Sequence, residues 1–228
     1  MRKDLITQLI YRVVLCVVSA FSCLLSLGIF YININGGAHF SWNFLKYYTN
    51  LSNYFVFIVS AVVLAETVRR VRNGEREGYN RKWRTFKFMV VIMILVTYLV
   101  VVFLLYSPLT VGYWLDVGNM SFHCLAPLLF IFDFILFDEK RTIPARAPLY
   151  SLILPLIYVC GIMIVGASVP GFTYPYFFLD VDLLGYGGVA VWVLILLVIF
   201  TILGYLLWLW NRLDKVDGKW VLDVHAKK

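Results

Sequence analysis

Residues 86–106 read FKFMVVIMILVTYLVVVFLLY and carry a single charged side chain, that of Lys87. A helix needs about 20 predominantly apolar residues to cross the hydrocarbon core of a bilayer. Inside hydrocarbon every backbone N–H and C=O group must be paired, so an apolar block of this length is stable only as a helix. The stretch therefore predicts a transmembrane helix, and with it a membrane protein.

Five further apolar blocks accompany this one along the chain. The six predicted spans cover residues 9–31, 44–66, 86–106, 119–137, 149–169 and 188–210. The blocks do not alternate polar and apolar residues, as the strands of a membrane β-barrel do. The composition agrees: 62% of the residues are hydrophobic and 14% are charged, whereas a soluble domain carries about 25% charged residues. We predict an all-α polytopic bundle of six transmembrane helices over residues 1–212, with a short cytoplasmic tail at 213–228.

The basic residues lie almost entirely on one side of the predicted bundle. Of the 20 Lys and Arg residues, all but Lys46 belong to the two tails, to the connections after the second and fourth spans, or to the margins of these segments. Such residues stay cytoplasmic, so both termini are expected in the cytoplasm. We interpret the net charge of +7 as a topology signature. Nucleic-acid binding would need a basic face with interleaved aromatic residues on a folded domain, and the sequence predicts no such face.

The N-terminal apolar stretch is expected to be an uncleaved first span, because it is too long for a signal peptide and no A-x-A site follows it. The four cysteines all lie within predicted spans. No C-x-x-C pair and no Cys/His spacing typical of a metal site is present. The sequence therefore predicts no metal, cofactor or disulfide framework.

Two sets of polar residues interrupt the apolar spans near the outer side. Thr49, Ser52 and Asn53 share one face of a helix, because positions i, i+3 and i+4 are neighbours. His123 is the one histidine within a span. At 1.5 Å per residue, Thr49 lies ~8 Å into the second span and His123 lies ~5–7 Å into the fourth. A nucleophile and its base need hydrogen-bond reach, and this matched depth meets a necessary condition for it.

The outer loop before the sixth span is rich in aromatic residues and contains two carboxylates. Asp180, Asp182 and Asp116 are candidates to orient the imidazole of His123, as in a Ser-His-Asp triad. Asp133 lies ten residues beyond His123, ~15 Å deeper, and cannot serve it within the same helix. We expect Asp133 to pair with a basic residue at the inner surface.

Several short motifs, in their order along the chain, resemble a known family. They are Ser41-Trp42-x-Phe44-Leu45 ahead of Thr49, His123-x-x-x-Pro127, and Tyr174-Pro175 before the sixth span. With its six spans, the chain resembles the androgen-induced-protein-like family, whose animal members are membrane threonine hydrolases that cleave fatty acid esters of hydroxy fatty acids. The likeness covers nearly the whole chain and is closer to uncharacterised bacterial members, through residues 48–53, 134–138, 174–180 and 185–187. It implies Thr49 and His123 as catalytic residues and a bacterial plasma membrane as the location.

One departure from the family concerns the nucleophile. In the animal enzymes the threonine follows the Phe-Leu pair directly, whereas here Lys46, Tyr47 and Tyr48 intervene. An ungapped alignment would place Lys46 at the nucleophile position. We prefer Thr49, because the polar helix face continues from it and because a lysine at a span end is typical of a snorkelling anchor. Lys46 is also a candidate contact for a substrate carboxylate.

The expected activity is hydrolysis of an amphiphilic fatty-acyl ester that enters from the outer leaflet. His123 takes the Thr49 proton, an acyl-threonine forms, and water then hydrolyses it. Asn50, Ser52 and Asn53 are candidate oxyanion donors. The competing hypothesis is a transporter or lipid-binding protein whose Thr49/His123 cavity holds a ligand without reacting. An assembly partner for another membrane protein is a third possibility. The expected contacts are membrane lipids and the ester, and the oligomeric state stays open.

Overall fold

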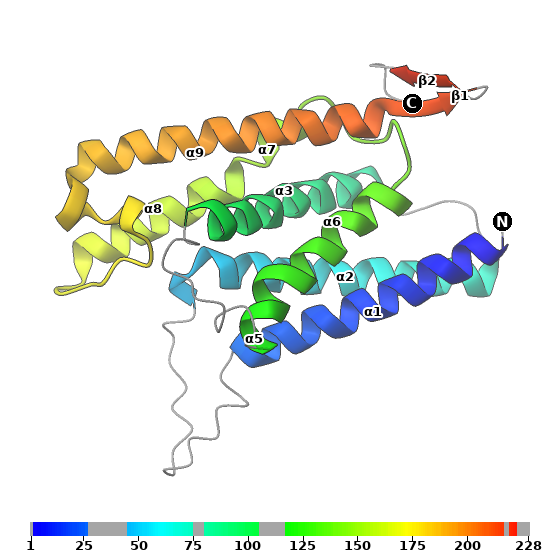
Figure 1. Cartoon of the computed structure of the whole chain (residues 1–228), viewed down its shortest axis with the longest axis horizontal. Helices are drawn as coiled ribbons and strands as arrows, with labels where there is room; N and C mark the ends of the chain where they lie inside the picture. The colour runs from blue at the N-terminus through cyan, green and yellow to red at the C-terminus, as the bar shows by residue number, and fades with distance from the viewer. Residues whose placement is uncertain (1, 27–44, 75–79, 105–116, 217–218, 223–228) are drawn as a thin grey trace, which may run out of the picture.

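The computed structural model describes residues 2–26, 45–74, 80–104, 117–216 and 219–222 of the chain (Figure 1). The helices in these ranges are α1 (Arg2–Ser26), α2 (Tyr48–Asn73), α3 (Arg81–Phe103), α5 (Val117–Met120), the π-helical turn η2 (Ser121–Leu125), α6 (Ala126–Phe137), α7 (Ala147–Tyr150), α8 (Ile153–Ser168), the 3₁₀ turn η3 (Phe177–Leu179) and α9 (Val181–Arg212). Two short strands follow, β1 (Leu213–Val216) and β2 (Lys219–Leu222).

Six helical segments are long and apolar enough to cross a membrane, which confirms the predicted all-α bundle of six spans. They are Asp4–Ser26, Tyr48–Asn73, Arg81–Phe103, Val117–Phe137, Ala147–Ser168 and Val181–Arg212. The fourth, whose predicted span is short and carries His123 and Asp133, is a run of helix made of α5, η2 and α6. Several segments extend beyond the predicted apolar blocks, because charged side chains do not by themselves end a helix. The segment α2 continues until Gly74, whose φ of 68° is left-handed and ends the helix as glycine commonly does.

Side-chain caps mark the starts of two of the helices. The Asn80 side chain accepts the N–H of Trp83 at 3.1 Å and begins α3. The Asp180 carboxylate accepts the N–H groups of Asp182 and Leu183, at 2.9 and 3.1 Å, and begins α9. These bonds satisfy N–H groups that the first turn of a helix leaves without an intrahelical partner.

The helix α3 lies at the centre of the bundle and is the most buried of the six spans. It contacts α2, α6, α7 and α9, while α1 packs against α2 and α6. The helices α8 and α9 leave large apolar side chains exposed, among them Ile164 and Leu194, as lipid-facing helices do. Figure 1 shows the N- and C-termini at the same end of the bundle, as six antiparallel spans require.

A cluster of buried charges joins four helices near the end of the bundle where the termini lie. Arg12 donates from Nε to Oδ1 of Asp133 at 2.9 Å and from Nη1 to the hydroxyl of Thr67 at 2.7 Å. Lys87 donates from Nζ to Oδ2 of Asp133 at 2.5 Å and also contacts Asp138. The expectation that Asp133 pairs with a basic residue is thus confirmed. Arg12 and Lys87 were predicted to lie at the cytoplasmic margins of the spans and to help set the topology, but their side chains are buried in the bundle.

A short antiparallel hairpin follows α9 in the part of the chain expected to be a tail. The strands β1 and β2 pair with Leu213 opposite Leu222. The rings of Trp210 and Trp220 lie 6.3 Å apart, which places the hairpin against the end of α9. Asp217-Gly218 lies between the strands in sequence, and this dipeptide is a strong signal for a two-residue hairpin loop.

Candidate functional site

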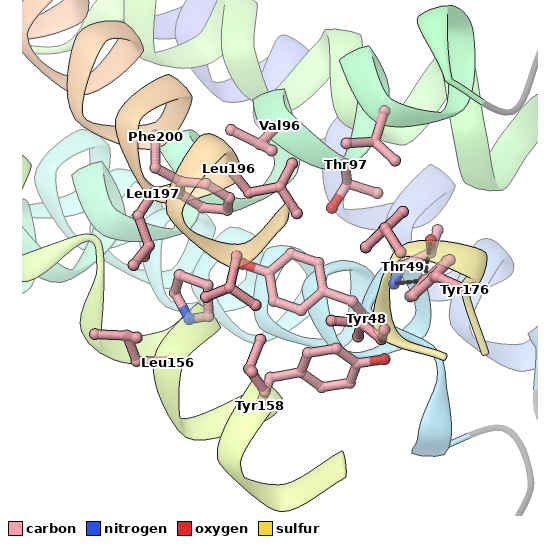
Figure 2. A pocket seen from close by; sticks show the side chains of 16 residues that line it. Tyr48, Thr49, Val96, Thr97, Leu156, Tyr158, Tyr176, Leu196, Leu197 and Phe200 are labelled. Carbon is pink, nitrogen blue, oxygen red and sulfur yellow. Dashed lines mark hydrogen bonds between the residues drawn. The ribbon is translucent and has the colours of Figure 1, made fainter. Parts of the chain in front are cut away.

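Thr49 lies in the first turn of α2, at the end of the bundle opposite the buried charges. Tyr47, just before the helix, has extended backbone angles, and the first N–H groups of a helix lack intrahelical partners. The Thr49 N–H donates to the phenol oxygen of Tyr176 at 3.3 Å, and the Thr49 Oγ1 lies 3.2 Å from the same oxygen. Both contacts are drawn as dashed lines in Figure 2. The phenol thus holds both the backbone and the side chain of Thr49.

Ser52 and Asn53 fix the turn that carries Thr49. Both are buried and hydrogen bond to the carbonyl of Thr49, from Ser52 Oγ at 2.8 Å and from Asn53 Nδ2 at 2.9 Å. The Asn53 amide also donates to the carbonyl of Phe122 at 3.1 Å, and Ser52 accepts from Thr97 at 3.1 Å. The predicted polar face therefore exists, and these two residues tie α2 to η2 and to α3.

His123 lies in the π-helical turn η2. In this turn the N–H of Ala126 donates to the carbonyl of Ser121, five residues back, and the hydroxyl of Ser121 lies 2.6 Å from that of Ser22 in α1. Such π-turns are rare and occur frequently at functional sites. The two residues that precede His123 are therefore anchored, Ser121 to α1 through Ser22 and Phe122 to α2 through Asn53.

One cavity brings Thr49 and His123 together, as their equal depth in the spans predicted. Its volume is about 240 Å³, and its wall is formed by Tyr47, Thr49, Asn50, Val101, His123, Pro175 and Tyr176. Of the three predicted polar support residues, the structure places Asn50 in this wall, while Ser52 and Asn53 lie behind Thr49. The partner that the structure gives to the Thr49 hydroxyl is Tyr176.

A second, apolar pocket meets the first at Thr49. It has a volume of about 60 Å³ and shares Thr49 and Tyr176 with the first cavity. Its remaining wall comes mainly from α3, α8 and α9 and includes Val96, Leu156 and Phe200 (Figure 2). The Thr49 hydroxyl therefore lies between a cavity that contains an imidazole and a narrow pocket lined by aliphatic and aromatic side chains.

Tyr48 and Tyr158 form the aromatic floor of the apolar pocket. Their rings lie 5.0 Å apart, and the Tyr158 hydroxyl donates to the carbonyl of Lys46 at 2.6 Å. Figure 2 shows the Tyr48 ring crossing the pocket next to Thr49, with its hydroxyl directed toward the α9 side chains. The hydrogen bond from Tyr158 thus helps to position the residues that precede Thr49.

The Lys46 side chain points to the loop between α8 and α9. Its Nζ donates to the carbonyl of Thr173 at 3.3 Å and lies 5.9 Å from the centre of the Phe172 ring. It does not belong to the described walls of either cavity. This position fits the anchor that the sequence suggested, whereas Thr49 belongs to the wall of the cavity that His123 lines.

The carboxylates that were candidates to orient His123 have other positions. Asp180 caps α9, and Asp182 lies in the first turn of that helix; neither is in the described wall of the cavity that contains His123. Asp116, the third candidate, lies outside the described residues. The structure thus accounts for Asp180 by its capping bonds, which stabilise a helix start by about 1 kcal/mol.

Tyr176 is the site residue that sequence reasoning did not single out. It is buried, and burial raises the pKa of its phenol above the usual value, although the hydrogen bonds with Thr49 act in the opposite direction. The phenol is therefore protonated at neutral pH and can donate a hydrogen bond. The sequence feature that could have identified Tyr176 was its position in the aromatic loop before the sixth span, on the same side of the bundle as Thr49 and His123.

Comparison with known proteins adds no relative: no family model, curated protein or solved structure matches this chain. The likeness to the androgen-induced-protein-like family therefore stays an expectation drawn from short motifs.

Proposed function

We propose that this protein is an intramembrane lipid-ester hydrolase in which Thr49 is the nucleophile and His123 is the base. The observation that carries the proposal is the place of the Thr49 hydroxyl, where the His123 cavity meets the apolar pocket. An ester bound with its carbonyl at Thr49 would have its acyl chain among aliphatic and aromatic side chains. The polar half of the molecule would face Asn50 and His123.

The reaction proceeds in two steps through a covalent intermediate. His123 accepts the Thr49 proton while Oγ1 attacks the ester carbonyl, and the protonated imidazole then gives that proton to the leaving alkoxide. The products of this step are an acyl-threonine and the free alcohol. Water, deprotonated by His123, attacks the acyl-threonine, and the protonated imidazole returns the proton to Oγ1 of Thr49 as the fatty acid is released.

Tyr176 and Asn50 are the donors we assign to the developing negative charge. The phenol oxygen of Tyr176 accepts from the Thr49 N–H, so its own proton is available to Oγ1 or to the carbonyl oxygen of the ester. A neutral phenol in a site with little water is an effective donor to an oxyanion. Asn50 shares the cavity wall with His123 and offers a side-chain amide.

The orientation completes the proposal. We place both termini in the cytoplasm of a bacterial cell, with the site in the outer half of the plasma membrane. The support is the distribution of Lys and Arg along the sequence, since 19 of 20 belong to the two tails, to the connections after the second and fourth spans, or to the margins of these segments. The ester would then enter from the outer leaflet.

Ligand binding without reaction is the second candidate function. It is favoured by one observation, that the partner of the Thr49 hydroxyl is the Tyr176 phenol, whereas a nucleophile is activated through its base. In this case the two cavities hold an amphiphile for storage or transport. Thr49→Ala distinguishes the two functions. It should retain ligand binding, which requires the shape of the pocket, and abolish hydrolysis, which requires the hydroxyl.

Ester hydrolysis by the detergent-purified protein tests the proposal. The substrates are a fatty acid ester of a hydroxy fatty acid and a medium-chain chromogenic ester. Thr49→Ala and His123→Ala should abolish turnover, while Lys46→Ala should retain it. Thr201→Ala is the matched control, because the Thr201 hydroxyl only donates to the carbonyl of Leu197 within α9. A folded parent without turnover on either ester would favour the ligand-binding function.

A further inference from the structure

A basic hollow opens between the start of α3 and the segment that leads into α8. Its volume is about 940 Å³, and it is lined by Arg81, Lys82, Thr85, Phe86 and Met89 on one side and by Pro144, Ala145, Arg146 and Tyr150 on the other. It lies at the far end of the bundle from Thr49, since α2 begins beside Thr49 and α3 begins after α2 has ended. The hollow is therefore separate from the candidate active site.

The α3 wall changes from charged to apolar with depth. Arg81 and Lys82 lie in the first turn, Thr85 and Phe86 one turn further, and Met89 about 12 Å below Arg81 at 1.5 Å per residue. Residues three and four apart lie on the same helix face, so all five line one wall. From its mouth inward this wall presents cations, then a hydroxyl, then aromatic and thioether surface.

The opposite wall repeats this order. Arg146 precedes α7, and Tyr150 lies four residues further into the membrane segment. Both side chains are exposed, and so are the neighbouring apolar residues Leu149 and Ile153. Two walls from separate parts of the chain thus place positive charge at the same level, above surface suited to hydrocarbon.

The cations of the hollow have no acidic partner among the described residues. The ion pairs recorded at this end of the bundle use other basic residues, such as Arg84 with Glu139 at 2.5 Å and Arg12 with Asp133 at 2.9 Å. No described carboxylate lies within 4.0 Å of the cationic nitrogens of Arg81, Lys82 or Arg146. Three cations that converge on one hollow without a carboxylate favour an anionic ligand.

We propose that this hollow binds one anionic phospholipid from the adjacent leaflet. Arg81, Lys82 and Arg146 hold the headgroup phosphate, and the acyl chains run down along Phe86, Met89 and Tyr150. The size of the hollow falls within the range of small-molecule sites, about 300–1000 Å³. A lipid fits better than a soluble phosphate because the charged mouth continues into apolar surface on both walls.

Lipid binding to the delipidated protein in neutral detergent tests this site. The probes are dioleoyl-phosphatidylglycerol, dioleoyl-phosphatidylcholine and soluble glycerol 3-phosphate, and the measurements are native mass spectrometry and the thermal unfolding midpoint. The parent should bind the glycerol lipid at least about tenfold more tightly than the choline lipid, since each basic residue near a lipid surface contributes substantially. Glycerol 3-phosphate at the same concentration should not stabilise the protein.

Charge-removing variants identify the hollow as the binding site. Arg81→Gln/Arg146→Gln removes one cation from each wall and should weaken phosphatidylglycerol binding about tenfold or more. The matched control Arg69→Gln/Arg72→Gln removes two exposed cations from the end of α2 and should retain binding within about twofold, as should Arg81→Lys/Arg146→Lys. If the double variant does not fold, Lys82→Gln alone should still weaken binding about fivefold.

Three results would overturn the proposal. Equal binding of the two lipids by the parent would remove the anionic selectivity. Equal losses in the hollow variant and the α2 control would show only a general effect of surface charge. Stabilisation by glycerol 3-phosphate as strong as that by the lipid would assign the hollow to a soluble phosphate. None of these readouts depends on turnover, so the lipid site and the hydrolase proposal fail separately.

Discussion

The phenol oxygen of Tyr176 lies 3.2 Å from the Oγ1 of Thr49 and accepts the Thr49 N–H at 3.3 Å, across 127 residues of sequence. This pair joins the first turn of α2 to the loop between α8 and α9. It also places a protonated phenol beside the hydroxyl that we propose as a nucleophile. The position of Thr49 is therefore set from outside its own helix.

Tyr176→Phe tests the role of this phenol, because it removes the hydroxyl and keeps the ring that stacks on Phe178. In the hydrolase, loss of one donor to the oxyanion should lower kcat about 10²-fold with little change in KM. The measurement is steady-state hydrolysis of the chromogenic ester. A change in KM alone would mean that Tyr176 only helps to bind the ester.

Asn53→Ala should destabilise the bundle at the base of the site. The change leaves the buried carbonyls of Thr49 and Phe122 without this amide, and each buried polar group that loses its partner costs about 1–3 kcal/mol. The thermal unfolding midpoint in detergent should fall accordingly. Ser60→Ala is the control on the same helix, because the buried Ser60 hydroxyl has no hydrogen-bond partner among the described residues. Similar midpoints for both variants would contradict the anchoring role of Asn53.

Asp133→Asn tests the buried charge cluster. It removes the negative charge between Arg12 and Lys87, all three being buried, and breaking a buried ion pair costs about 3–5 kcal/mol. The exposed pair Arg84–Glu139 provides the comparison, since Glu139→Gln should cost at most about 1 kcal/mol. Equal effects of the two substitutions on the unfolding midpoint would show that the buried cluster contributes no more than a surface pair.

The proposed orientation can be tested with cysteines placed at the two ends of the bundle. The substitutions are Arg72→Cys and Val169→Cys. Arg72 lies at the end of α2 near the termini, and Val169 lies just after α8 at the other end; both positions are exposed. In intact cells, a membrane-impermeant maleimide should label position 169 and should reach position 72 only after permeabilisation. The parent, whose native cysteines lie in helices of the spans, gives the background. The reverse labelling pattern would place the termini outside.

Much of the fold was predictable because bilayer thickness and backbone pairing constrain apolar blocks so strongly. The shared cavity of Thr49 and His123 was predictable in part, since helix rise converts sequence position into depth. The pairing of Asp133 with basic residues followed from the cost of a buried charge. These predictions concern properties along a helix axis, which periodicity and length describe well.

What could not be predicted lies mostly in loops and in local hydrogen bonding. Tyr176 is in an irregular segment, where no periodicity indicates which aromatic side chain points inward. The π-turn around His123 depends on contacts from α1 and α2 that the local sequence does not specify. Asp180 was one of three candidates to orient His123, although an aspartate directly before an apolar helix is a recognised N-cap signal. That signal favoured the capping role that the structure shows.

The residue that becomes acylated during turnover distinguishes Thr49 from any other nucleophile. The purified protein is mixed with a medium-chain chromogenic ester and quenched in acid, and its peptides are then analysed by mass spectrometry. The account predicts an acyl group on Thr49 that is absent from Thr49→Ala and fails to form in His123→Ala. An acyl group on Lys46, or turnover without any adduct on Thr49 under single-turnover conditions, would contradict it.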